Sequence, residues 1–88
     1  MTEPTALPTP DVITVYGADW CWDCLRARRH LDDSGVAYRY VDLGQDRAAQ
    51  RLVSDAGYRA IPVVVGTAGQ VLVEPSNAEL DDLLLAAS

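Results

Sequence analysis

Short apolar runs and amphipathic segments alternate along the chain. Residues 12–16 form a β-branched and aromatic run, closed by Gly17, which predicts a buried strand. Small or apolar residues then recur at helical spacing: Cys24, Ala27 and Leu31. Polar residues fill the opposite face, and Gly35 supplies a left-handed stop. The pattern therefore predicts a strand that leads straight into an amphipathic helix.

The same alternation continues through the middle of the chain. Residues 37–42 are predicted as a second strand. The helix predicted after it is closed by Gly57, and its apolar face consists of Ala49, Leu52, Val53 and Ala56. The result is a β-α-β-α unit, in which the first helix crosses over between two parallel strands.

The last third of the chain predicts a hairpin and a closing helix. Residues 61–65 and 70–73 have the pattern of antiparallel strands, joined by the loop at residues 66–69. Ser76 and Glu79 have the spacing of a capping box. The helix that they begin has one apolar face, made of Leu80, Leu83, Leu84 and Ala87. The complete prediction is an α/β domain of order β-α-β-α-β-β-α, with a four-stranded mixed sheet and flanking helices.

Length and composition fit one folded domain. The chain has 88 residues, of which 49% are hydrophobic and 23% charged, as in an ordinary globular domain. Residues 1–10 hold three prolines and few large apolar side chains, so we expect a flexible tail there. The single domain is predicted over residues 11–88. A chain this short favours a monomer.

The charge of the chain argues against two classes of partner. The formal net charge is -6 at pH 7, whereas a phosphate backbone or an anionic lipid surface attracts an excess of Lys and Arg. We therefore expect neither a nucleic acid nor a membrane as partner. The first ten residues lack the pattern of a secretory signal, and no stretch has the length of a membrane span. The expected location is cytoplasmic.

Two cysteines are the clearest chemical feature. Cys21 and Cys24 are the only cysteines of the chain, and they lie too close together to cross-link distant parts of a fold. A strand-to-helix turn places the Cys21 sulfur beside unpaired backbone N–H groups, where a thiolate is stabilised. Cys24 lies one turn inside the helix and is more protected. We therefore predict that Cys21 attacks a disulfide and that Cys24 resolves the mixed disulfide.

The neighbours of the cysteines leave alternatives open. Asp23 opposes a second negative charge and partly offsets the helix end. Trp20 and Trp22 either form an apolar platform for a substrate or shield the motif. The cysteines themselves also fit two small buried residues without chemistry. A metal site needs more ligands than this pair, and the single His30 is interpreted as a solvated surface residue, so we predict no bound metal or cofactor.

Three motifs carry a resemblance to a known family. They are Trp-Cys-Trp-Asp-Cys after a strand, Ala60-Ile61-Pro62-Val63 before a hairpin, and Pro75-Ser76-Asn77-Ala78-Glu79-Leu80 near the end. Across residues 12–86 the chain resembles the glutaredoxin-like redoxins, and most closely the mycoredoxins. The resemblance implies the thioredoxin fold, with strand order 2-1-3-4 and the third strand antiparallel to the first. It also implies a cis Ile61–Pro62 bond, although a proline is also tolerated at the first residue of a strand.

The resemblance extends to the substrate. In the family, the segment before the cis proline binds an extended substrate, so the Ile61 backbone is expected to face Cys21. Mycoredoxins use mycothiol, the sugar-linked cysteine thiol of actinobacteria, together with its reductase. Family members that use glutathione carry a Gly-Gly and Cys-Asp signature after the last strand. This chain has Glu-Pro-Ser-Asn at residues 74–77 instead, so glutathione is disfavoured as the low-molecular-weight thiol. Ser76 and Asn77 are therefore candidate substrate-binding residues, although Ser76 fits a helix cap equally well.

Two alternative functions remain. A redoxin of ribonucleotide reductase, reduced by thioredoxin reductase, has a Gly-Tyr stretch like residues 57–58, but its Trp-Ser-Gly-Phe-Arg-Pro signature is absent here. Tyr58 and Arg59 either border the groove and contact a partner or an anionic thiol, or cover the edge of the core. The other alternative is an iron–sulfur or partner-binding module on the same fold.

The preferred prediction is thiol–disulfide exchange on protein disulfides, or on mixed disulfides between proteins and a low-molecular-weight thiol. Cys21 and Cys24 are the predicted catalytic residues. The predicted substrate contacts are Trp20, Trp22, Tyr58, Arg59, Ile61, Pro62, Ser76 and Asn77.

Overall fold

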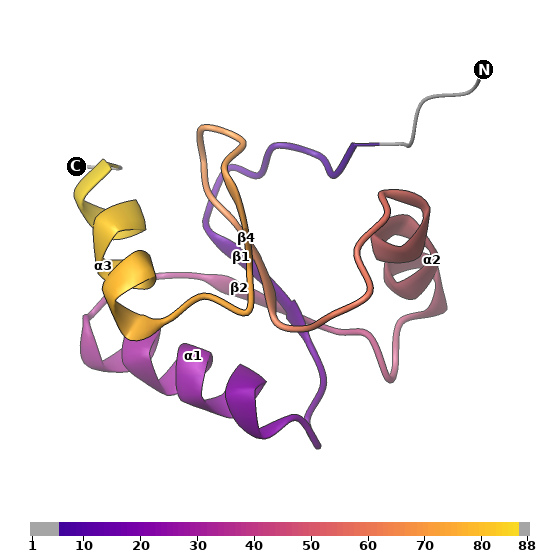
Figure 1. The fold of residues 1–88 in the computed structure, drawn as a ribbon, viewed down its shortest axis with the longest axis horizontal. Helices are drawn as coiled ribbons and strands as arrows, with labels where there is room; N and C mark the ends of the chain where they lie inside the picture. The colour runs from indigo at the N-terminus through magenta and orange to yellow at the C-terminus, as the bar shows by residue number, and fades with distance from the viewer. Residues whose placement is uncertain (1–5, 87–88) are drawn as a thin grey trace.

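The computed structural model describes residues 6–86 of the chain. Its elements follow the predicted β-α-β-α-β-β-α order (Figure 1). They are β1 (Thr14–Gly17), α1 (Trp22–Asp33), β2 (Arg39–Asp42), α2 (Arg47–Asp55), β3 (Val63–Val65), β4 (Val71–Val73) and α3 (Asn77–Ala86).

The strands form one mixed sheet of order β2-β1-β3-β4. β1 and β2 are parallel, whereas β3 is antiparallel to both β1 and β4. The strand order and directions implied by the resemblance are therefore confirmed. The predicted strand starts at residues 12, 37, 61 and 70 are wrong by one or two residues, because regular pairing begins only at residues 14, 39, 63 and 71. β3 starts late because Pro62 has no N–H to donate to a ladder.

The helices cover both faces of the sheet, with α1 and α3 on one face and α2 on the other (Figure 1). Successive side chains of a strand point to opposite faces, so each strand contributes to two core clusters. The first cluster contains Ile13, Val15, Ala27, Leu31, Val64, Leu80 and Leu83. The second contains Tyr16, Ala49, Val53, Val63 and Val65. The helix residues of both clusters belong to the predicted apolar faces. Ala87, which is also predicted on such a face, lies outside the described residues.

Glycines end α1 and α2, as predicted. Gly35 has a φ of 70° and Gly57 a φ of 91°, which is the left-handed region that favours glycine. After α1, the Val36 N–H donates to the Leu31 carbonyl oxygen at 3.2 Å and so caps the last turn. The chain then reverses and returns along the sheet as β2, parallel to β1.

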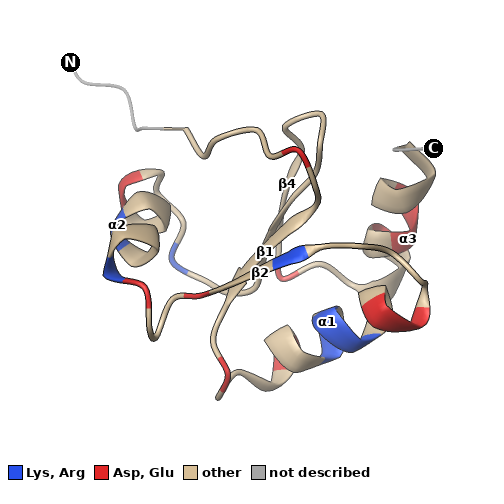
Figure 2. Ribbon diagram, turned by 180° about the vertical axis from the view of Figure 1, so that it is seen from behind, with Lys and Arg blue, Asp and Glu red and all other residues tan. Residues whose placement is uncertain are grey.

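His30 lies at the surface, as interpreted, but its side chain is partly covered and has a partner that the interpretation did not include. Its Nε2 lies 2.7 Å from Oδ1 of Asp81, and its side chain is only 22% exposed. The contact joins α1 to α3, and the sequence did not indicate it because the two residues are 51 positions apart. Figure 2 shows acidic residues on α3, which packs against α1, and basic residues in the middle of α1.

The structure describes the N-terminal segment only from residue 6. Residues 6–10 form no helix or strand, and Leu7 packs against the second core cluster. Residues 1–5 lie outside the described part, so the flexible tail stays a prediction. Within residues 6–86, no helix is long and apolar enough to cross a membrane.

Candidate active site around the cysteine pair

Cys21 is the N-cap of α1. Its backbone is extended, with φ -88° and ψ 112°, and its Sγ accepts a hydrogen bond from the Cys24 N–H at 3.2 Å. A sulfur at this position faces backbone donors that no helical carbonyl can satisfy, together with the positive end of the helix dipole. Both features are ones that stabilise a thiolate in proteins. Cys21 thus occupies the strand-to-helix turn that the sequence predicted.

Cys24 lies beneath Cys21 and is fully buried, whereas Cys21 is 9% exposed. Both are free thiols. Burial raises the pKa of the Cys24 thiol to about 12, and its contact with Cys21 adds to this effect. Cys24 therefore stays protonated near neutral pH. A protonated, more deeply buried thiol fits the predicted role of Cys24 as the resolving cysteine.

Gly17 makes room for the buried thiol. A Cβ added at Gly17 would lie 2.8 Å from the Cys24 Sγ, closer than real Cβ atoms approach, and 3.1 Å from the Cys24 Cβ, which is a tight contact. The sequence pattern indicates Gly17 only as the end of a strand. Its close approach to the cysteine could not be predicted, because it depends on how α1 packs on β1.

Ile61 and Pro62 lie next to the cysteine pair. The Ile61–Pro62 peptide bond is cis, as the resemblance implied. Ile61 packs against the small cluster formed by Ala18, Cys21 and Cys24. The Pro62 carbonyl oxygen accepts a hydrogen bond from the Glu74 N–H at 2.8 Å, whereas no backbone hydrogen bond joins Ile61 to another residue within 6–86. The Ile61 backbone is therefore available for an external partner.

A groove runs from the cysteine loop past Ile61 and has a volume of about 450 Å³. We call it the Ile61 groove. It brings together four of the predicted substrate contacts: Trp20, Tyr58, Arg59 and Ile61. Sequence reasoning missed other residues of its wall: Leu43, Gly44, Gln50 and Ser54. These come from the β2–α2 connection and from α2, and they carry no motif that could have marked them.

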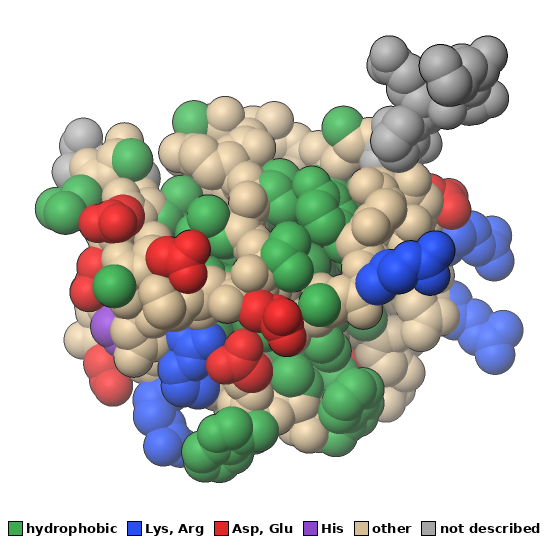
Figure 3. Space-filling model, viewed as in Figure 1, with side chains coloured by type: hydrophobic (Ala, Val, Ile, Leu, Met, Phe, Trp, Pro, Cys, Tyr) green, Lys and Arg blue, Asp and Glu red, His purple; other side chains and the backbone are tan. Residues whose placement is uncertain are grey.

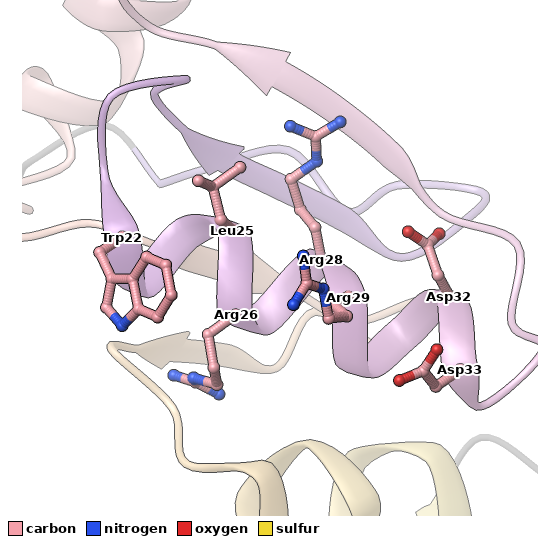
Figure 4. Close-up of a pocket in the computed structure, with 7 residues that line it drawn as sticks. All are labelled: Trp22, Leu25, Arg26, Arg28, Arg29, Asp32 and Asp33. Carbon is pink, nitrogen blue, oxygen red and sulfur yellow. The ribbon is translucent and has the colours of Figure 1, made fainter.

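Trp20 and Trp22, which flank Cys21 in the sequence, both lie at the surface. Their exposed fractions are 81% and 78%, and Figure 3 shows hydrophobic side chains at the surface where α1 begins. Trp20 lines the Ile61 groove, whereas Trp22 lines a separate hollow of about 380 Å³ along α1, with Leu25 and Arg29 (Figure 4). Neither cysteine lines either cavity, but Ala18 and Ile61, which pack against the cysteine pair, line the Ile61 groove. The Ile61 groove is therefore the better candidate for the reacting part of a substrate.

Ser76 and Asn77 are occupied by structural contacts. The Glu79 N–H donates to Ser76 Oγ at 3.1 Å and the Ser76 N–H donates to Glu79 Oε1 at 3.0 Å, which confirms the predicted capping box. The Asn77 Oδ1 accepts a hydrogen bond from Arg26 at 2.7 Å. Neither side chain lines the Ile61 groove. Their role in substrate binding stays a prediction.

A second group of contacts fixes the loop that carries Trp20. The Tyr40 hydroxyl donates to Asp19 Oδ1 at 2.9 Å, and the Arg28 guanidinium carbon lies 3.7 Å from the centre of the Tyr40 ring. Burial raises the pKa of Tyr40 well above its usual range, and the bond to Asp19 adds to this effect. Asp19 directly precedes Trp20, so these contacts hold the loop at the entrance of the groove. Sequence reasoning missed all three residues.

A family model and two known relatives each match most of the chain. The family model described as glutaredoxin matches residues 13–71. A provisionally named glutaredoxin from Mycobacterium tuberculosis strain H37Rv is 36% identical over 70 residues, which cover 77% of this chain and 83% of the relative. The gene 56 protein of Mycobacterium phage D29 is 32% identical over 73 residues, covering 82% and 81% of the two chains.

Solved structures show the same fold. A point mutant of the thioredoxin-like protein BC3987 has a TM-score of 0.77 at 31% identity, covering 86% of this chain and 97% of its own. The glutaredoxin-like NrdH-redoxin from Escherichia coli has a TM-score of 0.74 at 20% identity, covering 81% and 92%. At that lower identity the likeness concerns the fold alone.

Proposed function

The chain belongs to the glutaredoxin family, and on this premise we propose that it is a thiol–disulfide oxidoreductase that uses Cys21 as nucleophile and Cys24 as resolving thiol. The observation that carries the proposal is the N-cap position of Cys21, whose Sγ accepts the Cys24 N–H directly above a fully buried second thiol. A structural pair of small buried residues needs neither the helix N-terminus nor the groove beside it.

The reaction has two exchange steps. The Cys21 thiolate attacks one sulfur of a substrate disulfide, the substrate S–S bond breaks, and the leaving sulfur departs as a thiolate that takes up a proton. Cys24 then loses its proton and attacks the Cys21 sulfur, which releases the second substrate thiol. The substrate disulfide gains two electrons and two protons, and the Cys21–Cys24 dithiol becomes a disulfide. A low-molecular-weight thiol or a reductase returns the pair to the dithiol.

The second step depends on a change in the Cys24 environment. Besides burial, the hydrogen bond and the negative charge of Cys21 raise the pKa of Cys24. When Cys21 is part of a mixed disulfide, it carries no charge and these two effects are lost. Cys24 therefore ionises more easily at the moment when its attack is needed.

Mycothiol is the proposed low-molecular-weight thiol, with its reductase as recycling partner. Support comes from the resemblance to mycoredoxins, from the identity to the mycobacterial relative, and from the absence of the glutathione signature at residues 74–77. In this proposal Ile61 pairs with an extended substrate, Pro62 shapes the groove, and Arg59 contacts an anionic group. Trp20, Trp22 and Tyr58 contribute apolar surface. The protein acts as a cytoplasmic monomer.

A second candidate is an electron donor reduced by thioredoxin reductase. The observation that favours it is the Gly57-Tyr58-Arg59 stretch, because Tyr58 and Arg59 line the Ile61 groove, where a reductase would also dock. The other alternative, an iron–sulfur module, would give a coloured protein on purification.

The test supplies the protein with NADPH and a disulfide substrate, first with mycothiol and its reductase and then with thioredoxin reductase. We expect NADPH to be consumed with the mycothiol system. Cys21→Ser should lose all activity, whereas Cys24→Ser should still remove a small thiol from a protein, since that reaction needs only one cysteine. Activity only with thioredoxin reductase would overturn the mycothiol proposal and favour the second candidate.

A further inference from the structure

Arg26 connects the cysteine motif to a distant part of the chain. Its NH2 donates to Asp23 Oδ1 at 2.7 Å and to the Pro75 carbonyl oxygen at 2.6 Å. Its NH1 donates to Asn77 Oδ1 at 2.7 Å, and its Nε donates to Asp23 Oδ1 at 3.2 Å. Every nitrogen of the guanidinium group therefore has a partner, and Figure 4 shows the side chain directed from α1 towards the segment before α3.

This arrangement differs from an ordinary pair on a helix surface. An Asp–Arg pair three residues apart is usually mobile and contributes little, because both side chains lose freedom to form it. Here Pro75 and Asn77 hold the guanidinium independently of Asp23. The side chain of Arg26 is 27% exposed and that of Asp23 43%. Because these two contacts already order the guanidinium, its pairing with the Asp23 carboxylate costs less side-chain entropy.

Asp23 lies between the two cysteines in sequence and in the first turn of α1. Burial is the main cause that raises the pKa of Cys24, and the Asp23 charge adds to it. The field of the Asp23 carboxylate therefore reaches Cys24, next to the nucleophile. An uncompensated carboxylate there also opposes the formation of a thiolate at Cys21.

We propose that Arg26 is a positioning residue for the exchange reaction: it holds the Asp23 carboxylate towards Pro75 and Asn77 and offsets its charge, so that a larger fraction of Cys21 is thiolate. This inference rests on the proposed function, because it concerns the same nucleophile. It explains how a carboxylate is accommodated inside the cysteine motif. It also gives Pro75, which is fully buried, a part in placing Arg26.

The experiment measures the ionised fraction of Cys21 against pH by the ultraviolet absorbance of the thiolate, in a Cys24→Ala background. Absorbance is preferred to an alkylation rate, since a more basic thiolate is also more nucleophilic. Arg26→Gln should raise the ratio of thiol to thiolate roughly two- to fivefold at a given pH, the size expected for a partly exposed ion pair. Arg26→Lys, which keeps the charge, should recover most of the loss.

The decisive comparison is with Asp23→Asn. If Arg26 acts by offsetting Asp23, Arg26→Gln should have less than about half of its effect in the Asp23→Asn background. The effect should also shrink in about 1 M salt. An equal effect with and without the carboxylate would overturn the proposal, as would an unchanged ionised fraction in Arg26→Gln.

Arg29→Gln is the matched control, because Arg29 lies on the same helix, is exposed and forms no ion pair with another residue in the described part of the chain. It should change the ratio much less than Arg26→Gln. Urea unfolding of each variant confirms that the fold is intact. The titration needs no substrate, so its outcome is independent of whether the protein catalyses the proposed exchange.

Discussion

Replacing Gly17 with alanine adds a methyl group where the structure has no space for it. The new carbon would lie 2.8 Å from the Cys24 Sγ, about 0.6 Å inside the shortest ordinary contact. Cys24 is fully buried and belongs to the close-packed cluster with Ala18 and Cys21, so it has little room to move. Overpacking of this kind costs about 1–3 kcal/mol. We expect Gly17→Ala to lower the free energy of unfolding of the reduced protein by that amount.

The assay is urea unfolding under reducing conditions, carried out in the wild type and in a Cys24→Ala background. Removing the sulfur leaves the Cys24 Cβ 3.1 Å from the added carbon, a contact that a small shift relieves. Gly17→Ala should therefore cost less than about half as much in the Cys24→Ala background. The same cost in both backgrounds would refute the explanation, because the sulfur would then not be the obstacle.

Three further predictions concern stability. Leu31→Ala should lower the free energy of unfolding by about 2–5 kcal/mol, since Leu31 is fully buried between the sheet and α3; a cost below about 1 kcal/mol by urea unfolding would contradict this packing. Burial raises the pKa of Cys24 from 9.0 to about 12, so the unfolded chain loses this proton first. The reduced protein should become less stable as the pH rises from 9 towards 12, and an equally steep loss in Cys24→Ala would exclude this thiol as the cause. Tyr40→Phe should lower the free energy of unfolding by about 1 kcal/mol, because the hydrogen bond to Asp19 is lost. Hydrogen exchange should also become faster in the loop that carries Trp20, and unchanged exchange there would argue against an anchoring role.

The order of the elements could be predicted from the sequence because it depends on local patterns. The helical spacing of Cys24, Ala27 and Leu31, and the left-handed glycines at 35 and 57, are properties of a few neighbouring residues. The capping box of Ser76 and Glu79 is equally local. For the same reason the N-cap position of Cys21 followed from its place between a strand and a helix.

The contacts between distant segments could not be predicted in this way. The bonds from Arg26 to Pro75 and Asn77 span 49 and 51 residues, and they exist only because α1 packs beside the start of α3. The one local signal for Arg26 was its spacing from Asp23, which alone indicates an exposed pair. The strand order and the cis Ile61–Pro62 bond came from the resemblance to a family, because the residue pattern fits several strand orders and either isomer.

The central claim is that Cys21 is the nucleophile and Cys24 the resolving thiol. The most direct measurement is to mix Cys24→Ser with a mixed disulfide of mycothiol and a reporter protein, and to locate the covalent adduct by mass spectrometry of the digested protein. We expect mycothiol attached to Cys21 in this variant, whereas the wild type under the same conditions should contain a Cys21–Cys24 disulfide. Transfer of the thiol by a Cys21→Ser variant, or the absence of any adduct on Cys21, would contradict the account.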